Sequence, residues 1–104
     1  MAKNTQDPTF KKLQPLIRFV KLLSHPVRLF VVMELLDGDE CSVGYLVSKL
    51  KIEFSVVSKH LAILKKAGIV TTIRDRQWVY YRLKNAEIIS FVRQLQNLHL
   101  PFSR

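Results

Sequence analysis

The sequence predicts a mainly α-helical fold with one small β-hairpin near its C-terminal end. Three observations lead to this prediction. Apolar residues recur at the three- and four-residue spacing of a helix through most of residues 9–67. Two β-rich segments, residues 69–73 and 78–83, then flank a short polar turn. Helical spacing returns after Asn85, so the expected order is four helices, a hairpin and a fifth helix.

The length of the chain indicates how many domains it forms, and its charge indicates what kind of partner it binds. A chain of 104 residues is of a size that forms one core, so we expect residues 1–9 to be a polar lead-in and residues 10–100 to be the domain. Seventeen Lys and Arg against eight Asp and Glu give a net charge of +9. This excess predicts a nucleic acid as partner, ahead of an acidic protein or an anionic membrane. With no apolar run that could span a membrane and no secretory signal, a cytoplasmic location is expected.

The first two helices are each introduced by a proline. We expect the first helix over residues 9–23, with Asp7 as its N-cap and Pro8 in its first turn. Pro15 lies inside this segment and is expected to kink the helix or to mark its true start, because it removes a backbone donor. The second helix restarts at Pro26. Its predicted apolar face consists of Leu29, Phe30, Met33 and Leu36.

The next two helices are short and closely connected. Ser42 can cap the third, and the fourth is expected over residues 53–67, with Gly68 as its stop. Two such helices have the proportions of a helix-turn-helix, to which the hairpin 69–83 adds a wing. In that motif the second helix lies in the major groove of DNA, with its N-terminal residues nearest the bases. The spacing alone also fits a helical hairpin in a purely structural bundle.

Polar and basic side chains gather on the fourth helix and on the wing. Such side chains contact bases and phosphates, and a valine can contact a thymine methyl group. The predicted DNA-binding residues are Ser55, Val56, Ser58, Lys59, His60, Lys65, Arg74, Arg76 and Gln77. For His60, packing of the helix is an equal alternative. Trp78 and Tyr80 either stack on nucleic acid or, as we favour, pack the wing onto the body.

Three motifs, in this order, resemble the ArsR/SmtB family of winged-helix repressors. Residues 23–29, LSHPVRL, are similar to the family's opening LADPTRL. Residues 56–61, VVSKHL, and 64–70, LKKAGIV, are similar to its recognition helix TVSRHLxxLRxAGLV. Residues 78–83, WVYYRL, match its wing strand. The resemblance covers roughly residues 13–98, and it implies a repressor that binds an operator on double-stranded DNA as a homodimer.

Two places depart from the family's pattern. The recognition helix usually begins with Ser-Gln-Ser, where this chain has Glu53, Phe54 and Ser55. Phe54 lacks the polar contact of a glutamine and Glu53 repels phosphate, so we expect a different operator sequence. At the wing tip, Arg76-Gln77 replaces the usual Gly-Arg. A positive φ angle is harder to adopt without glycine, so we expect another turn shape there.

The residues with which family members sense metals or sulfur species are missing. The metal-binding cysteine pair corresponds here to Ser42 and Gly44, and the single Cys41 falls one residue earlier. One thiolate makes no soft-metal site, and the last helix offers only Glu87 and His99, twelve residues apart. We therefore expect no metal site and no cofactor, and the sequence supports no metal or small-molecule inducer. Cys41 is expected to be buried or half-buried, with an intersubunit disulfide or an oxidation switch as the alternative.

The first and last helices carry more apolar side chains than so small a monomer can cover. A twofold partner is the expected solution, and the resemblance implies the same pairing of helices. The alternative is that these two helices pack only within one chain. The predicted interface residues are Phe10, Leu13, Ile17, Val20, Ile88, Phe91, Val92, Leu95 and Leu98.

Together these patterns predict a sequence-specific transcriptional regulator, a homodimeric repressor that reads an inverted-repeat operator through the helix 53–67 and the wing 69–83. Two alternatives stay open: a winged-helix module that binds an acidic protein, and a regulator switched by oxidation at Cys41. An enzyme is not expected, because the sequence has no paired-carboxylate motif, no Gly-rich phosphate loop and no metal-ligand spacing.

Overall fold

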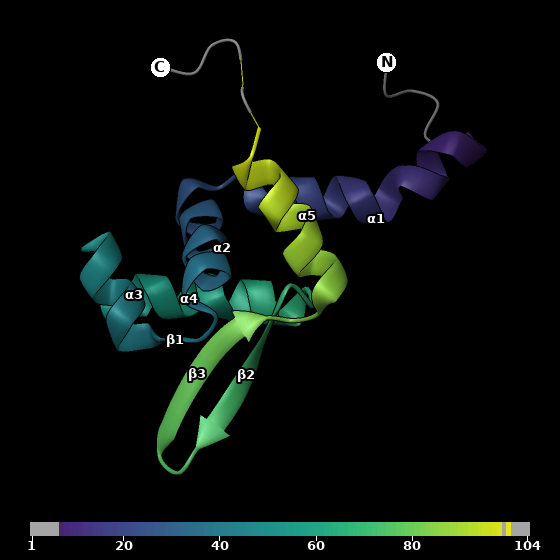
Figure 1. Ribbon diagram of the computed structural model, residues 1–104. Helices are drawn as coiled ribbons and strands as arrows, with labels where there is room; N and C mark the ends of the chain where they lie inside the picture. The colour runs from purple at the N-terminus through teal and green to yellow at the C-terminus, as the bar shows by residue number, and fades with distance from the viewer. Residues whose placement is uncertain (1–6, 99, 101–104) are drawn as a thin grey trace.

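The computed structural model describes residues 7–98 and Leu100, which form five helices and a three-stranded antiparallel sheet (Figure 1). The elements in chain order are α1 (Pro8–Leu23), α2 (Pro26–Gly38), β1 (Cys41–Ser42), α3 (Val43–Leu50), α4 (Phe54–Lys66), β2 (Val70–Asp75), β3 (Trp78–Leu83) and α5 (Ala86–Gln96). This order confirms the predicted fold class. Residues 1–6 of the expected lead-in and His99 lie outside the described residues.

The first two helices begin at their prolines, the first with the predicted Asp7 cap and the second with a side-chain cap from His25. The Thr9 amide donates to Asp7 Oδ1 at 2.7 Å, and the Val27 amide donates to His25 Nδ1 at 3.1 Å. Proline fits directly after such a cap because the first amides of a helix have no partner within it. Pro15 lies inside an unbroken α1, so a helix start at this residue is wrong.

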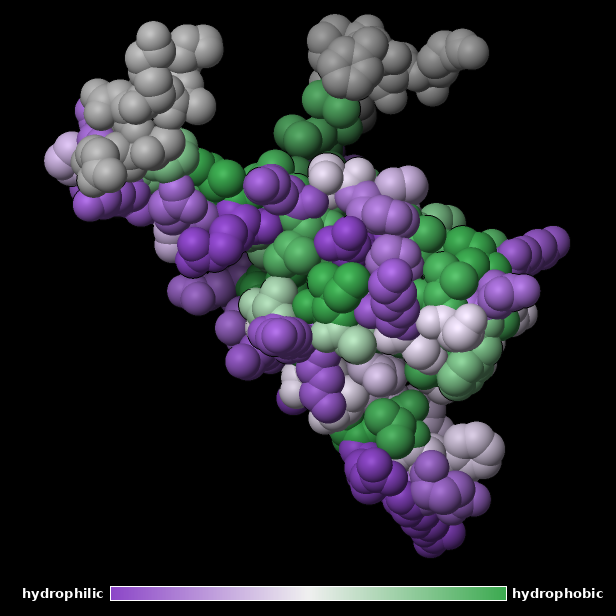
Figure 2. Space-filling model, turned by 180° about the vertical axis from the view of Figure 1, so that it is seen from behind, coloured by the Kyte–Doolittle hydropathy of each residue, from purple (hydrophilic) through white to green (hydrophobic). Residues whose placement is uncertain are grey.

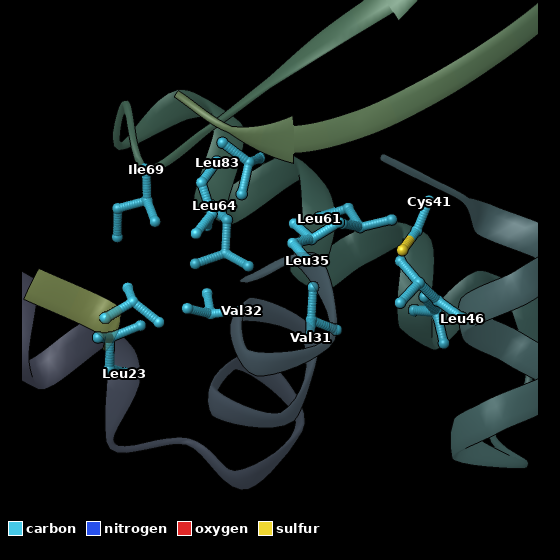
Figure 3. Packing of buried hydrophobic residues seen from close by; sticks show 13 residues of the cluster. Leu23, Val31, Val32, Leu35, Cys41, Leu46, Leu61, Leu64, Ile69 and Leu83 are labelled. Carbon is cyan, nitrogen blue, oxygen red and sulfur yellow. The ribbon is translucent and has the colours of Figure 1, made fainter. Parts of the chain in front are cut away.

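The core lies where α2 and α4 meet the sheet and the loop before β2 (Figure 3). Its fully buried side chains include Val31, Val32, Leu35, Leu46, Val57, Leu61, Leu64, Val70 and Val92. The predicted apolar face of α2 is wrong in part, because Leu29 and Phe30 are 36% and 41% exposed. Apolar residues occur on nearly every side of α2, so periodicity alone does not identify the side that faces the core.

A short third strand, which the sequence analysis missed, connects the wing to the body. β1 pairs antiparallel with β3, placing Cys41 opposite Tyr81. Two residues are too few to show the alternating pattern of a strand, so no sequence signal indicated this one. At its inner end the β2–β3 hairpin has the buried pair Val70 and Leu83, while its outer end projects from the helices (Figure 1).

The turn of the wing contradicts the expectation of another turn shape. Asp75 pairs with Trp78, so only Arg76 and Gln77 connect the strands, and Arg76 has a φ angle of +61°. Two-residue hairpins favour positive φ because it matches the right-handed twist of the strands. The pairing of the strands therefore holds an arginine in a conformation that usually costs a non-glycine residue about 1–3 kcal/mol.

Two histidines join the start of α2 to the middle of α4. The rings of His25 and His60 have their centroids 4.3 Å apart, and His60 is 9% exposed. Burial, followed by electrostatic repulsion from His25, Arg28 and Lys59, lowers the pKa of His60. His60 is therefore held neutral between the two helices, and this contact contributes to the position of α4.

This contact predicts a stability that depends on pH. In the unfolded chain a histidine binds a proton with a pKa near 6.5, whereas the folded protein resists protonation of His60. The stability that neutral His60 contributes is therefore complete above about pH 6.5, and it decreases as the pH falls toward the lowered folded-state pKa. Urea unfolding across this range should show a steeper loss for the wild type than for His60→Gln. Parallel curves would contradict the assignment, and His60→Asn is a second neutral variant if the first does not fold.

Candidate nucleic-acid interface

The helix-turn-helix is built by α3, a tight turn and α4. Ser42 Oγ caps α3 by accepting from the Tyr45 amide at 3.1 Å. Lys51 ends the helix with a φ angle of +58°, and its amide donates to the Val47 carbonyl at 2.8 Å. This left-handed residue turns the chain sharply and lets α4 begin at Phe54, packed against α3. The geometry confirms the predicted winged helix-turn-helix.

The buried side of α4 determines which residues it presents to the outside. Val57, Leu61 and Leu64 are fully buried and hold this side against the core. The opposite side carries exposed residues at helical spacing, namely Ser55, Lys59, Ala62 and Lys66. Ser58 and Lys65 lie along one edge of this exposed face, and Val56 lies along the other. A small alanine between two lysines allows the helix to approach a surface of opposite charge.

His60 does not belong to the exposed face. Its ring contacts His25 in the body of the protein, and its Nδ1 has no hydrogen-bond partner among the described residues. Of the two alternatives for His60, the structure therefore favours packing over a DNA contact.

The outer end of the wing is polar and basic. Arg74, Arg76 and Gln77 are all exposed there, and Figure 2 shows this end as the hydrophilic tip of the molecule. Trp78 is 57% exposed, so the expectation that it packs the wing onto the body is wrong. Tyr80 is half-buried opposite Ser42 of β1, and for this residue packing is the better description.

Phe54 is a candidate contact that the sequence reasoning missed. It is the first residue of α4, and it is 61% exposed. An aromatic residue at the start of a predicted recognition helix was the available signal. Phenylalanine lacks the polar contact expected at this position, but it offers an apolar contact instead.

Cys41 is buried, as expected. It is 3% exposed, and its sulfur points into the core toward Leu46 (Figure 3). Burial, followed by the nearby carboxylates of Glu34 and Asp39, raises the pKa of the Cys41 thiol. The reactive thiolate is therefore disfavoured, which argues against an oxidation switch at this residue.

Neither a cluster of metal ligands nor a membrane-spanning helix occurs in the described part of the chain. Over residues 7–98 and Leu100, no three His, Cys, Asp or Glu side chains come together in an arrangement that could bind a metal ion. Within the same residues, no helix is both long enough and apolar enough to cross a bilayer.

Apolar surface is exposed along α1, which extends from the body (Figures 1 and 2). Leu13, Leu16 and Val20 on one side of this helix are each about half exposed. Near the end of α1, the Phe19 ring meets the edge of the Phe91 ring of α5, with centroids 4.9 Å apart. Beside this contact lies an open hollow of about 480 Å³, lined by residues of α1, α5 and the loop before β2.

The predicted interface residues divide into three groups in the structure. Leu13, Val20 and Leu98 are exposed. Half-buried residues make up the second group, namely Phe10, Ile17, Ile88, Phe91 and Leu95. Val92 is fully buried within its own chain, so its assignment to an interface is wrong. A helix with a broad apolar stripe can pack against its own core and against a partner at the same time. Helical spacing alone does not tell which of its residues lie in the core and which in the interface.

Comparison with known proteins identifies the family. Residues 25–72 match the family model described as bacterial regulatory protein, arsR family. The chain is 35% identical over 94 residues to a biofilm growth-associated repressor of Xylella fastidiosa, which covers 90% of this chain and 82% of the relative. It is 36% identical over 80 residues to the transcriptional activator HlyU of Vibrio cholerae, covering 77% of this chain and 73% of the relative.

Solved structures agree with this match. Reduced HlyU from Vibrio cholerae superposes with a TM-score of 0.78 at 34% identity, covering 86% of this chain and 93% of that one. The homodimeric winged helix-turn-helix DNA-binding domain of Mb0332 from Mycobacterium bovis superposes with a TM-score of 0.75 at 25% identity, covering 92% and 87%. The chain therefore belongs to the ArsR family of bacterial regulatory proteins, as a winged helix-turn-helix transcriptional regulator that binds DNA and is not an enzyme.

Proposed function

We propose that the chain works as a homodimeric repressor that binds an inverted-repeat operator and blocks access to a promoter. The observation that carries this proposal is the exposed face of α4, which lies opposite its buried side and is accompanied by a basic wing. Each protomer places one α4 in the major groove of one half-site, and the half-sites lie about one helical turn or a multiple of it apart. The proposed DNA contacts are Ser55, Val56, Ser58, Lys59, Lys65, Arg74, Arg76 and Gln77.

The contacts of α4 divide by chemistry. Lys59 and Lys65 are exposed cations that neutralise phosphates or donate to guanine, whereas Ser55 and Ser58 exchange hydrogen bonds with bases or phosphates. Val56, at 36% exposure, offers an apolar contact for a thymine methyl group. The first two turns of the helix thus hold the side chains that read sequence, and its last turn holds phosphate contacts.

The wing supplies a second contact at a distance from α4. Arg74 and Arg76 lie on both sides of Asp75, so the tip has a net positive charge. The positive φ angle of Arg76 places this residue at the point of the turn. Two cations at the end of a projecting hairpin suit the phosphate backbone or a narrow minor groove, both of which are strongly negative.

The dimer rests on the apolar surface of α1 and α5. Leu13, Leu16 and Val20 face one side of α1. The hollow between α1 and α5 lies on another side of this helix, where Pro15, Arg18, Phe19 and Leu22 line it. Exposed apolar side chains gathered on one helix face mark an interaction site, and a second copy of the same chain covers them with matching surface. Dimerisation also joins two α4 helices into one reading unit, which is what an inverted repeat requires.

Salt titration tests the electrostatic part of the proposal. The logarithm of the binding constant for duplex DNA should fall linearly with the logarithm of salt concentration, with a slope of about −0.9 for each neutralised phosphate. Lys59→Ala and Arg74→Ala should weaken binding and make the slope shallower by about that amount for each phosphate that is no longer neutralised. Lys12→Ala, an exposed lysine on α1, is the matched control and should leave both quantities unchanged. Normal binding by both variants, or a preference for an acidic protein over operator DNA, would refute these assignments.

A charge on the apolar side of α1 tests the dimer. Val20→Glu should separate the protomers, because a dimer would then bury two unpaired carboxylates, and operator affinity should fall because a lone protomer binds one half-site. Lys11→Glu, half a helical turn around the same helix, is the control and should stay dimeric. Sedimentation equilibrium measures the mass of both variants. A dimeric Val20→Glu protein would place the interface elsewhere.

A further inference from the structure

The start of α4 carries an apolar side chain that the proposed function does not use. We propose that Phe54 contacts the methyl group of a thymine in the major groove, one in each half-site, and that it makes this thymine a required base of the operator. This inference rests on the proposed operator binding and adds a specificity-determining residue to it.

The exposure of Phe54 is the first observation. At 61%, it is the most exposed of the large hydrophobic residues over the described chain, ahead of Trp78 and Leu98 at 57%. Phe54 is absent from the half-buried residues that pack against the core. Most of this residue is therefore open to water, and it presents apolar area on the element proposed to read DNA.

The position of Phe54 on α4 is the second observation. The N-terminal residues of a recognition helix lie nearest the base edges, and Phe54 is the first residue of α4. Ser58, four residues later, lies on the same edge of the helix, and Lys65 continues that edge. Phe54 thus extends the row of proposed contacts beyond its N-terminal end.

The neighbouring charge is the third observation. Glu53 is the exposed N-cap of α4 and makes no side-chain hydrogen bond there. A carboxylate next to Phe54 disfavours a phosphate at this end of the helix, and it can accept a hydrogen bond from the amino group of a cytosine. The pair Glu53 and Phe54 is therefore suited to the floor of the groove and not to the backbone.

The chemistry of the groove then selects the ligand. Among the base edges of the major groove, the C5 methyl group of thymine is the apolar one, and phenylalanine is among the side chains that contact it. The methyl group of 5-methylcytosine occupies the same place and offers the same surface. An unmethylated C·G pair or a uracil has only a hydrogen at C5, so the ring of Phe54 would lose its methyl contact.

The test removes this methyl group and nothing else. Operators are selected from a random duplex library with the purified full chain, and each thymine of the selected operator is then replaced by uracil. At one thymine position in each half-site, uracil should lower wild-type affinity. Replacement in one half-site should lower it about fourfold, the value of one buried methyl group, and replacement in both half-sites about fifteenfold. The salt dependence should not change, because no phosphate contact is altered.

Variants assign the effect to the side chain. Phe54→Gln and Phe54→Ala should bind the thymine and uracil operators equally well. Trp78→Ala is the matched control, because it removes the strongly exposed aromatic side chain of the wing. This variant should keep the full penalty for uracil. With a C·G pair at the same position, methylation of the cytosine should restore affinity for the wild type and not for Phe54→Ala.

The outcomes separate this inference from the function on which it rests. A wild-type protein that binds its operator with normal salt dependence, yet tolerates uracil at every position, overturns the role of Phe54 alone. A penalty for uracil that persists in both Phe54 variants does the same and moves the methyl contact to another residue. Failure to select any operator overturns the proposed function, and the role of Phe54 with it.

Discussion

The burial of one side of α4 against the core is the contact on which the rest of the structure depends. Val57, Leu61 and Leu64 are removed from water completely, and burying a side chain of this size contributes about 1.5–3 kcal/mol. Rotating the helix by one residue, about 100°, would expose these side chains and turn Lys59 toward the interior. The apolar side of α4 therefore determines its polar side, and the DNA-binding surface follows from the packing of the core.

Two smaller features position the remaining parts around this core. β1 pairs with β3 and holds the wing against the body, so that its tip extends beyond the helices. The His25 ring caps α2 and also meets His60 of α4, which links the start of one helix to the middle of another. A core this small leaves α1 with apolar surface that its own chain does not cover, and a partner is the means of covering it.

Local signals in the sequence were sufficient for most of the elements. Asp7 and Ser42 cap helices where they were expected, because a cap depends on residues two or three positions away. The face of α2 was not predictable, since apolar residues surround that helix. The role of His60 was open for a related reason, because a histidine near the edge of a helix suits either water or the interior.

The sequence by itself determined the order of the elements, the helix-turn-helix and the family, since these depend on short-range spacing and on motifs read along the chain. Tertiary structure alone decided the strand β1, the positive φ angle of Arg76, the burial of Val92 and the exposure of Phe54. Each of these depends on what lies across space from the residue. The surroundings concerned are a pairing partner, a twisted hairpin, a neighbouring helix and open solvent. The residues next to each position in the sequence do not indicate them.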